Sequence, residues 1–389
     1  MNLNSKYSQR GVSSDKTEVH SAIASIDKGL YPNSFCKILP DYMGGDKEYC
    51  NIMHADTAGT KTSLAYVYWR ETGDNSVWKG IIQDAIVMNI DDMACVGVTD
   101  NIILSSTIGR NKNKVTGEVI KNLIQGTQDF LIKMETLGVK IHLAGGETAD
   151  VGDIVRTLDV GFTAMARLKR DEIININIQS GDVIVGLSSY GKATYENEYN
   201  SGMGCNGLTN ARHDVFSNYL AGKYPESFDP SIPPGLVYSG TKKLTEIENE
   251  TGFTYGKLVL SPTRTYLPVL QRIIKELRPE IHGLIHCTGG GQTKVMKFVN
   301  NLHIIKDKLF PIPPLFRIIK EEAHSDWDEM YQVFNMGHRM EIYVKPEIAK
   351  KIIKFAGQFN IEAKVIGRCE ASKKNKLTIK TEHGEFVYQ

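Results

Sequence analysis

Apolar residues recur at helical spacing in two stretches of the first half of the chain. Positions 78, 81, 82, 85 and 86 form one stripe, and positions 119, 123, 130, 131 and 134 form another. Gly138 follows the second stripe, where a glycine commonly ends a helix. Shorter runs rich in β-branched residues predict strands at 51–55, 101–106, 139–144 and 158–166. We therefore expect strands and helices to alternate.

The second half repeats this alternation after a polar stretch at 167–172. An apolar strand is predicted at 183–187, and apolar residues between 266 and 277 all fall on one face of a helix. Weaker patterns predict helices near 327–334 and 349–359 and strands at 339–344, 363–366 and 376–381. We expect a fold of class α/β to α+β. Its segments are an N-terminal arm with connecting segments (1–50), an N-terminal domain (51–172) and a C-terminal domain (173–389).

Composition narrows the class of protein. In 389 residues, 41% hydrophobic and 23% charged residues are ordinary globular values, which exclude disordered and fibrous classes. A net charge of +1 provides no field that attracts nucleic acid, so no nucleic-acid partner is expected. No apolar run of about 18 residues predicts a membrane span. Six scattered cysteines without a Cys-x-x-Cys pair indicate a reducing compartment, and we expect a cytoplasmic protein.

Asp56, Gly59, Thr60 and Lys61 follow the predicted strand at 51–55 together. Glycine permits close backbone approach to a ligand, lysine neutralises phosphate oxygens, and a carboxylate can hold Mg²⁺. This combination is typical of a phosphate site with its metal. A polar turn between strands explains the hexapeptide about equally well.

Two further groups of acidic and polar residues end predicted elements. Asn89, Asp91 and Asp92 lie at the C-terminal end of a predicted helix, where the helix dipole disfavours carboxylates unless a cation compensates. The segment 145–150, which contains Glu147, follows the predicted strand at 139–144. Three such ends in one domain favour a shared site for an anion and a metal over unrelated surface turns.

The second half has one glycine-rich candidate, Thr288 followed by three glycines at 289–291. It lies between a strand-like run at 283–285 and a helical run at 294–299, so its backbone N–H groups can bind an anion. A tight turn explains the glycines nearly as well. The adjacent His286 and Cys287 have no visible orienting partner, so we interpret them as strand residues.

Taken in order, seven motifs resemble the phosphoribosylformylglycinamidine cyclo-ligase family, also called aminoimidazole ribonucleotide (AIR) synthetase. The resemblance spans about residues 7 to 370. Ser-Pro-Thr-Arg-Thr-Tyr, Phe-Asn-x-Gly and Gly-Gly-Glu-Thr-Ala distinguish this family from relatives that make selenophosphate, phosphorylate thiamine phosphate or mature hydrogenases. The seven motifs are at 56–61, 89–92, 145–150, 206–208, 260–266, 288–291 and 334–337.

The resemblance implies a two-domain, ATP-dependent enzyme. The N-terminal domain would dimerise by joining its sheet to that of a second copy in an intersubunit β-barrel, and the C-terminal domain would be α+β. ATP and Mg²⁺ would lie between the domains. The implied reaction phosphorylates the formamide oxygen of formylglycinamidine ribonucleotide, after which the amidine nitrogen closes the imidazole ring.

The resemblance also implies roles for individual residues. Asp56, Lys61, Asp92 and Glu147 match catalytic positions; Asp56 and Asp92 would hold Mg²⁺, and Lys61 would contact phosphate. Further positions match nucleotide or substrate contacts in the glycine-containing loops and the second domain. They are Gly59, Thr60, Asn89, Asp91, Gly145, Gly146, Thr148, Asn206, Gly207, Thr288, Gly289, Gly290, Gly291 and Asn335.

The chain departs from the family pattern at several positions of the site. Asp91 stands where the family has Asn. Gly204 stands where the family has His, two residues before an Asn-Gly pair, and an insertion at Tyr195–Met203 precedes it. Either that His is dispensable or another group, such as His213 or Tyr195, replaces it. Two alternatives therefore stay open: a related phosphotransferase with another small substrate, and a non-catalytic nucleotide-binding paralogue.

Overall fold

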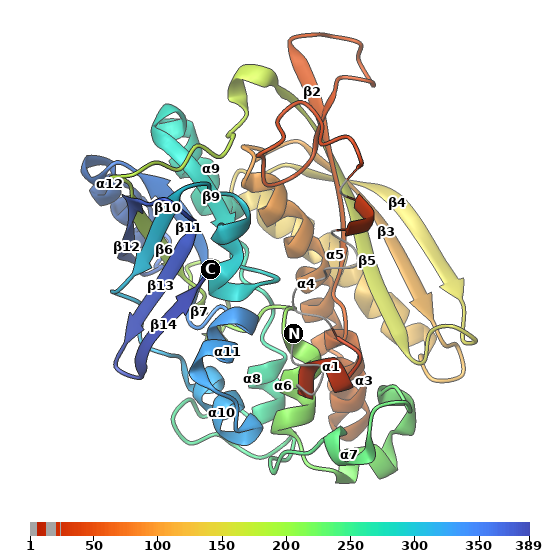
Figure 1. The fold of residues 1–389 in the computed structure, drawn as a ribbon. Coiled ribbons are helices and arrows are strands. Elements are labelled where there is room, and N and C mark those ends of the chain that lie inside the picture. The colour runs from red at the N-terminus through yellow and green to blue at the C-terminus, as the bar shows by residue number, and fades with distance from the viewer. Residues whose placement is uncertain (1–5, 13–20, 24) are drawn as a thin grey trace.

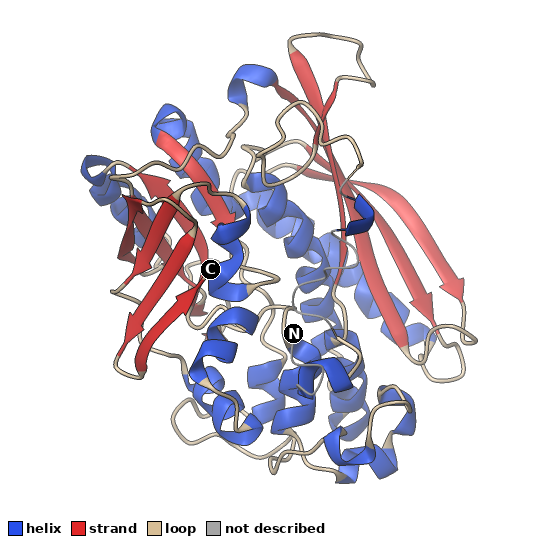
Figure 2. Cartoon of the chain, viewed as in Figure 1, coloured by secondary structure: helices blue, strands red, loops and turns tan. Residues whose placement is uncertain are grey.

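The computed structural model describes residues 6–12, 21–23 and 25–389, so residues 1–5, 13–20 and 24 of the expected arm lie outside the described part. Two β-sheets stand on opposite sides of a group of helices (Figure 2). The first sheet comes from the N-terminal part of the chain and the second from the C-terminal part (Figure 1). This arrangement leaves the helices between the sheets as the place where both halves meet.

The N-terminal sheet has five strands in the order β1-β2-β5-β3-β4. Neighbouring strands are antiparallel except β3 and β4, which are parallel. The strands are β1 (Ile38–Pro40), β2 (Tyr49–Thr57), β3 (Ile102–Arg110), β4 (Ile141–Asp150) and β5 (Leu158–Lys169). Side chains on successive strand residues point to opposite faces of such a sheet.

Helices α4 (Val77–Ala94) and α5 (Gly117–Thr136) cover one face of this sheet, and the other face looks away from the molecule (Figure 1). On that open face Met53 is 60% exposed and Ile103 is 46% exposed. Apolar side chains left in water on one face of an antiparallel sheet mark a candidate interface.

Helix α4 lies at the centre of the fold, and 14 of its 18 residues are buried. It packs against β2 and β5 on one side, and it also contacts α3 (Lys61–Thr72), α5 and α9 (Leu267–Leu277). Because α4 has almost no solvent-facing surface, each of its polar side chains must find a partner inside the protein.

The C-terminal sheet has seven strands in the order β14-β13-β10-β12-β6-β11-β9. Helix α12 (Pro346–Gly357) packs on β6 and β12, and α9 packs against α12. A separate two-stranded ribbon is formed by β7 and β8. The strands are β6 (Val183–Ser188), β7 (Tyr190–Gly191), β8 (Asn200–Ser201), β9 (Ile281–His286), β10 (Leu302–Lys306), β11 (His338–Val344), β12 (Ala363–Ala371), β13 (Lys376–Thr381) and β14 (Gly384–Tyr388).

The remaining helices are short and lie mostly around the junction of the two halves (Figure 1). They are α1 (Lys6–Gln9), α6 (Leu208–Val215), α7 (Tyr219–Lys223), α8 (Tyr255–Val259), α10 (Pro314–Ala323), α11 (Trp327–Val333) and α12 (Pro346–Gly357).

The structure confirms the helices predicted from apolar spacing, which correspond to α4, α5 and α9. Two motifs predicted to follow strands lie inside strands instead: Asp56 belongs to β2, and the segment 145–150 belongs to β4. β4 is an edge strand that is largely exposed beyond Ile141, so it lacks the apolar pattern of a buried strand. Its glycines bring it close to β3, because a Cβ on Gly146 would stand 2.1 Å from Ser106 Oγ. The domain limits 1–50, 51–172 and 173–389 stay predictions.

Candidate active site

Three buried aspartates of α4, Asp84, Asp91 and Asp92, face segments of the C-terminal half. Asp84 Oδ1 accepts hydrogen bonds from Thr263 N at 2.7 Å and from Thr263 Oγ1 at 2.6 Å. It also pairs with Lys61 Nζ at 2.8 Å. Residues 84, 91 and 92 fall on one face of a helix, since they are spaced by seven and eight positions. This face joins the two halves of the chain.

Lys61 is fully buried at the start of α3. Besides its ion pair with Asp84, its Nζ donates to the Ser261 carbonyl at 2.5 Å. The ammonium group is therefore directed at the Ser-Pro-Thr-Arg-Thr-Tyr segment and not at an open cavity. The phosphate contact expected for Lys61 stays a prediction, and its contacts in the structure join the start of α3 to the C-terminal half.

Asp91 holds the same segment further along. Its Oδ1 accepts from Thr265 Oγ1 at 2.7 Å and its Oδ2 accepts from Tyr266 N at 2.9 Å, just before α9 begins. Burial raises the pKa of Asp91, and the opposing effects of His286 and of these hydrogen bonds do not cancel that increase. Both carboxylate oxygens are thus engaged by protein groups.

Asp92 contacts two histidines from different halves of the chain. His286 Nδ1 lies 2.7 Å from Asp92 Oδ1, and His54 Nε2 lies 3.4 Å from Oδ2. Arg339 Nε donates to His286 Nε2 at 3.3 Å, so the ring proton sits on Nδ1 and donates to Asp92. Burial alone would raise the pKa of Asp92, but the hydrogen bond from His286, together with the positive charge of Lys294, outweighs it and holds the pKa below its ordinary value.

His54 connects Asp92 to the end of β2. Its Nδ1 lies 3.2 Å from Asn89 Oδ1, and Asn89 Nδ2 donates to the Asp56 carbonyl at 3.3 Å. Asp56 itself is half-buried. The structure therefore connects Asn89, Asp92 and the backbone of Asp56 through one polar network, and the shared site for an anion and a metal stays a prediction.

A cavity of about 240 Å³ lies between the two halves of the chain. It contains five of the predicted contact residues, and no acidic side chain lines it within the described part of the chain. Its lining is Tyr7, Val12, Thr60, Cys205, Asn206, Gly207, Leu208, Thr209, Gly289, Gly290, Gln332 and Val333. The predicted residues among them are Thr60, Asn206, Gly207, Gly289 and Gly290.

Two helices begin at this cavity. Thr60 precedes α3 and Gly207 precedes α6, and the hydroxyls of Thr60 and Thr209 lie 2.9 Å apart across the domain junction. A helix N-terminus presents unpaired N–H groups and a partial positive charge. Gly207 has φ 76, and a Cβ there would stand 2.4 Å from the Phe334 ring, so only glycine fits this turn. The cavity suits an anion.

The N-terminal segment closes one side of the cavity with Tyr7 and Val12. Arg10 anchors this segment: its buried guanidinium pairs with Asp214 at 2.7 Å and donates to Asn210 Oδ1 at 3.0 Å. Because Arg10 lies between Tyr7 and Val12 in the chain, its buried contacts fix the position of these two lining side chains.

Glu147 lies away from this cavity. Thr57, Gly161, Thr107 and Glu147 are successive partners across the sheet, so their side chains share one face. Three strand spacings of about 4.8 Å separate Thr57 from Glu147. Glu147 is exposed on the open face, on an edge strand together with Gly145, Gly146 and Thr148.

The remaining predicted residues of the second domain support the glycine loop. Thr288 Oγ1 accepts from Lys294 Nζ at 3.0 Å. A Cβ on Gly291 would stand 2.7 Å from the carbonyl oxygens of Phe334 and Tyr331. Asn335 Oδ1 accepts from Ser189 Oγ at 2.7 Å and its Nδ2 donates to the Gly202 carbonyl at 2.9 Å, so its amide holds the backbone and does not line the cavity.

Neither group suggested as a substitute for the missing His reaches the cavity. His213 is fully buried, and its Nδ1 accepts from Tyr238 N at 3.1 Å. Burial, with the charges of Arg212 and Arg10, lowers the pKa of His213 to about 2, so the ring is neutral. Tyr195 is also buried and donates to the Thr265 carbonyl at 2.6 Å.

The sequence motifs include neither His54 nor Asp84, and the sequence pattern predicts His286 only as a strand residue. His54 could have been found, because it precedes Asp56 by two strand positions and thus shares its face. The contacts of His286 with Asp92 and of Asp84 with Thr263 join residues 179 or more positions apart, and no local pattern indicates them.

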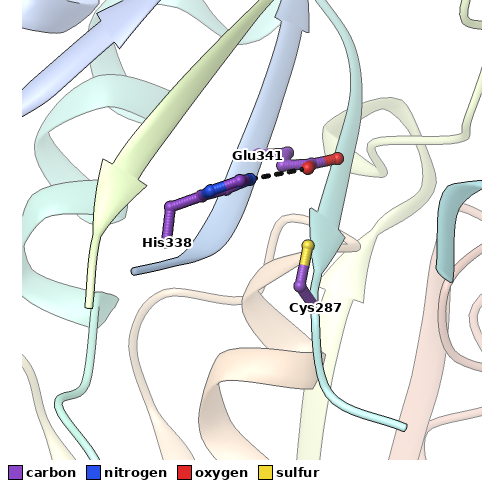
Figure 3. Close-up of side chains that lie close together, drawn as sticks. All are labelled: Cys287, His338 and Glu341. Atoms are coloured by element: carbon purple, nitrogen blue, oxygen red, sulfur yellow. Dashed lines mark hydrogen bonds and ion pairs between the residues drawn. The ribbon is translucent and has the colours of Figure 1, made fainter. Parts of the chain in front are cut away.

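Within the described part of the chain, one group of three side chains has atoms close enough together to hold a metal ion: Cys287, His338 and Glu341 (Figure 3). His338 Nε2 lies 3.0 Å from Glu341 Oε1, and Tyr343 OH donates to Oε2 at 2.6 Å. Lys306 Nζ also pairs with Glu341 Oε1 in this buried cluster. Because the lysine ammonium already neutralises the carboxylate, we interpret this group as an internal ion pair and not as a metal centre.

Two family models match the chain over most of its length. AIR synthase related protein, N-terminal domain, matches residues 39–168, and AIR synthase related protein, C-terminal domain, matches residues 233–380. The chain belongs to the AIR synthase related family. The resemblance drawn from the seven motifs is thereby confirmed, as is the two-domain mixed α/β fold, whereas the intersubunit barrel stays a prediction.

Curated relatives in this family cover nearly the whole chain. The phosphoribosylformylglycinamidine cyclo-ligase of Methanocaldococcus jannaschii is 28% identical over 327 residues, which is 82% of this chain and 78% of that protein. The cyclo-ligase of Saccharolobus solfataricus is 27% identical over 392 residues, 99% of both chains.

Solved structures share the AIR synthase fold. A chain of the HypE–HypF complex has a TM-score of 0.57 at 12% identity and covers 96% of this chain and 99% of its own. AaThiL complexed with AMPPCP and TMP has a TM-score of 0.53 at 10% identity, with 96% and 95% covered. Among the described residues, no helix is both long enough and apolar enough to span a membrane.

Proposed function

We propose that the protein is an ATP-dependent cyclo-ligase of purine biosynthesis, which converts formylglycinamidine ribonucleotide to 5-aminoimidazole ribonucleotide with release of ADP and phosphate. The observation that carries this proposal is the similarity to the Saccharolobus solfataricus cyclo-ligase over 99% of both chains. The cavity supports it independently, because predicted contact residues of both domains line the same space.

The reaction has two bond-forming steps. The formamide oxygen attacks the γ-phosphorus of ATP, and ADP leaves. The amidine nitrogen then attacks the activated carbon, the carbon–oxygen bond breaks, and phosphate leaves. A protein accelerates such a sequence mainly by aligning the reactants and stabilising phosphoryl charge.

The cavity is the proposed place for a phosphate-bearing end of a ligand. Its volume of about 240 Å³ is smaller than that of typical drug-sized ligand sites, so it holds part of a nucleotide and not the whole. Backbone N–H groups at the starts of α3 and α6 would donate to phosphate oxygens. The hydroxyls of Thr60 and Thr209 and the amide of Asn206 would orient the adjoining sugar.

Asp56 and Asp92 are the proposed magnesium ligands. Carboxylate oxygens are the donors that Mg²⁺ prefers, so the chemistry of the pair fits the ion. Mg²⁺, when bound, would neutralise charge on the transferred phosphoryl group. His286 Nδ1 lies 2.7 Å from Asp92 Oδ1, so Oδ2, which has only the longer contact of 3.4 Å with His54 Nε2, is the proposed donor to the ion. Lys61, paired with Asp84, is proposed to hold the two domains in register.

A homodimer is also proposed. The exposed apolar side chains on the open face of the N-terminal sheet support it, because this face has no partner within the described chain. Glu147 lies on the same face. In a dimer it would contribute to the site of the second copy, which explains its distance from Asp56.

The test is a coupled assay on the purified full-length chain with formylglycinamidine ribonucleotide, ATP and Mg²⁺. We expect ADP and the diazotisable aminoimidazole in equal amounts. The Asp92→Asn and Asp56→Asn variants should fold normally and lose at least 100-fold in kcat. ADP release without the aminoimidazole would point to another acceptor, and nucleotide binding without turnover would point to a non-catalytic paralogue.

A further inference from the structure

Gly204 stands beside a buried arginine. A Cβ added at Gly204 would have Arg339 Nη1 at 3.6 Å and Arg339 Cδ at 3.7 Å as its nearest neighbours. These are ordinary contact distances, and Gly204 is not in the left-handed backbone region. The backbone therefore does not require glycine here. The Arg339 guanidinium occupies the space next to the loop that a longer side chain at position 204 would enter.

Arg339 is held in place from two sides. Its Nε donates to His286 Nε2 at 3.3 Å, its Nη2 donates to the Arg264 carbonyl, and its guanidinium lies 5.5 Å from the centre of the Tyr266 ring. The residue is 1% exposed on β11. Two of its three nitrogens are thus fixed by protein acceptors.

The third nitrogen, Nη1, is buried and has no hydrogen-bond partner among the described residues. None of the carboxylates in that part of the chain forms an ion pair with Arg339, and the nearby Asp91 uses both oxygens for Thr265 and Tyr266. A buried cation with an unsatisfied N–H is costly unless a ligand completes it. Guanidinium groups match phosphate oxygens in geometry and charge.

Nη1 lies next to the loop that leads to the cavity, although Arg339 itself does not line the cavity. Gly204 is followed directly by Cys205, Asn206 and Gly207, which line the cavity and lead into α6. We infer that Arg339 binds a phosphate group of the ligand at the 204–207 loop and takes over the place of the His that the family has at position 204. This inference rests on the proposed function, and it adds Arg339 to the proposed ligand site.

Two phosphate sources fit this chemistry, the ribonucleotide substrate and ATP. Steady-state kinetics of the full-length chain distinguish them. We expect Arg339→Met to raise the KM for one of the two ligands at least tenfold and Arg339→Lys to raise the same KM less, because lysine keeps the charge. The ligand whose KM rises is the source of the phosphate.

Arg212→Met is the matched control. Arg212 is also a buried arginine, but it donates to the Ser227 carbonyl and the Tyr238 hydroxyl, away from Gly204. Both KM values should stay within twofold in this variant.

If neither KM changes in folded Arg339→Met, the inference is wrong while the proposed function stands. If the wild type forms no aminoimidazole, the proposed function fails. Calorimetric titration with inorganic phosphate then tests Arg339 alone, since binding must weaken at least tenfold in Arg339→Met.

A rescue variant separates ligand binding from a structural role. Introducing Gly204→His into Arg339→Ala places an imidazole where the guanidinium was removed. We expect at least a threefold gain in kcat/KM over Arg339→Ala. A double variant that is folded by thermal unfolding but no more active than Arg339→Ala would contradict the exchange of roles between positions 204 and 339.

Discussion

Lys61 shows how a single residue can match a motif and still have a different partner. Lysine after a glycine turn is typical of a phosphate contact, and no motif indicates its partner Asp84, which lies on another helix. Helical periodicity places Asp84, Asp91 and Asp92 on one face of α4, but it does not predict which residues they contact. Their partners Thr263, Thr265 and His286 come from the other domain, so tertiary structure alone could reveal them.

Breaking the Lys61–Asp84 pair should strongly destabilise the fold. Asp84→Asn leaves a buried ammonium without its counter-charge, and removing one partner of a buried pair costs about 3–5 kcal/mol of the free energy of unfolding. Urea unfolding measures this loss. The control is Asp129→Asn, whose exposed pair with Lys79 at 2.6 Å should contribute less than about 1 kcal/mol. Equal losses in both variants would contradict the role given to Asp84.

The buried Glu341 cluster predicts a dependence of stability on acid pH. Burial would raise the pKa of Glu341, but Lys306 and His338 outweigh it and lower the pKa from 4.5 to about 2. A carboxyl with a depressed pKa in the folded state stabilises that state above its unfolded pKa, and this contribution is lost as the pH falls from 4.5 to about 2.

Denaturant unfolding at a series of pH values tests this dependence. Glu341→Gln should be less stable than the wild type near neutral pH, and the difference should shrink towards pH 2. Glu385→Gln, at an exposed pair with Lys380, should follow the wild-type profile. A difference between Glu341→Gln and the wild type that is independent of pH would refute the assignment.

At the scale of elements, the helices with one buried face, such as α9, were predictable because their apolar residues recur at helical spacing. Exposed strands have no such recurring apolar pattern. β4 extends to Asp150 although the run of apolar residues ends near Ala144, because its hydrogen bonds to β3 and not its side chains define it. The sequence pattern of the segment 145–150 therefore predicts a loop, whereas the segment forms part of a strand in the structure.

The N-terminal segment should control access to the cavity. Arg10→Met removes the ion pair with Asp214, so Tyr7 and Val12 would no longer be held against the cavity. We expect the KM for at least one substrate to rise three- to tenfold, and trypsin to cleave faster after Lys6. Arg272→Met, on the exposed side of α9, should change neither value. Unchanged proteolysis in Arg10→Met would show that the segment is held by other contacts.

At the scale of the whole molecule, the motif order predicted the two halves and the family, and both are confirmed. The open face of the N-terminal sheet is the part for which we propose a partner outside the chain. It was expected only through the resemblance, since exposed Met53 and Ile103 carry no distinguishing pattern in the sequence. A strand whose exposed face becomes buried only when two chains associate has the same residue pattern as an ordinary strand.

Charge on this face should prevent dimerisation. Met53→Lys and Ile103→Lys place ammonium groups opposite each other in the proposed interface, so we expect light scattering to give the monomer mass of 43.4 kDa at concentrations where the wild type is a dimer. Activity should fall with the dimer if Glu147 serves the second copy. Ile124→Lys, on the outer side of α5 at 52% exposure, is the control that should stay dimeric. A monomeric wild type would overturn the proposal.

The aspartate-bearing face of α4 has a consequence for any attempt to divide the protein. An N-terminal fragment ending near residue 172 would keep Asp84, Asp91 and Asp92 but lack Thr263, Tyr266 and His286. Its most buried helix would then expose three carboxylates on a surface shaped for another chain. Neither half should therefore fold stably without the other. Fragments produced separately should aggregate, whereas fragments produced together in one cell should reassemble.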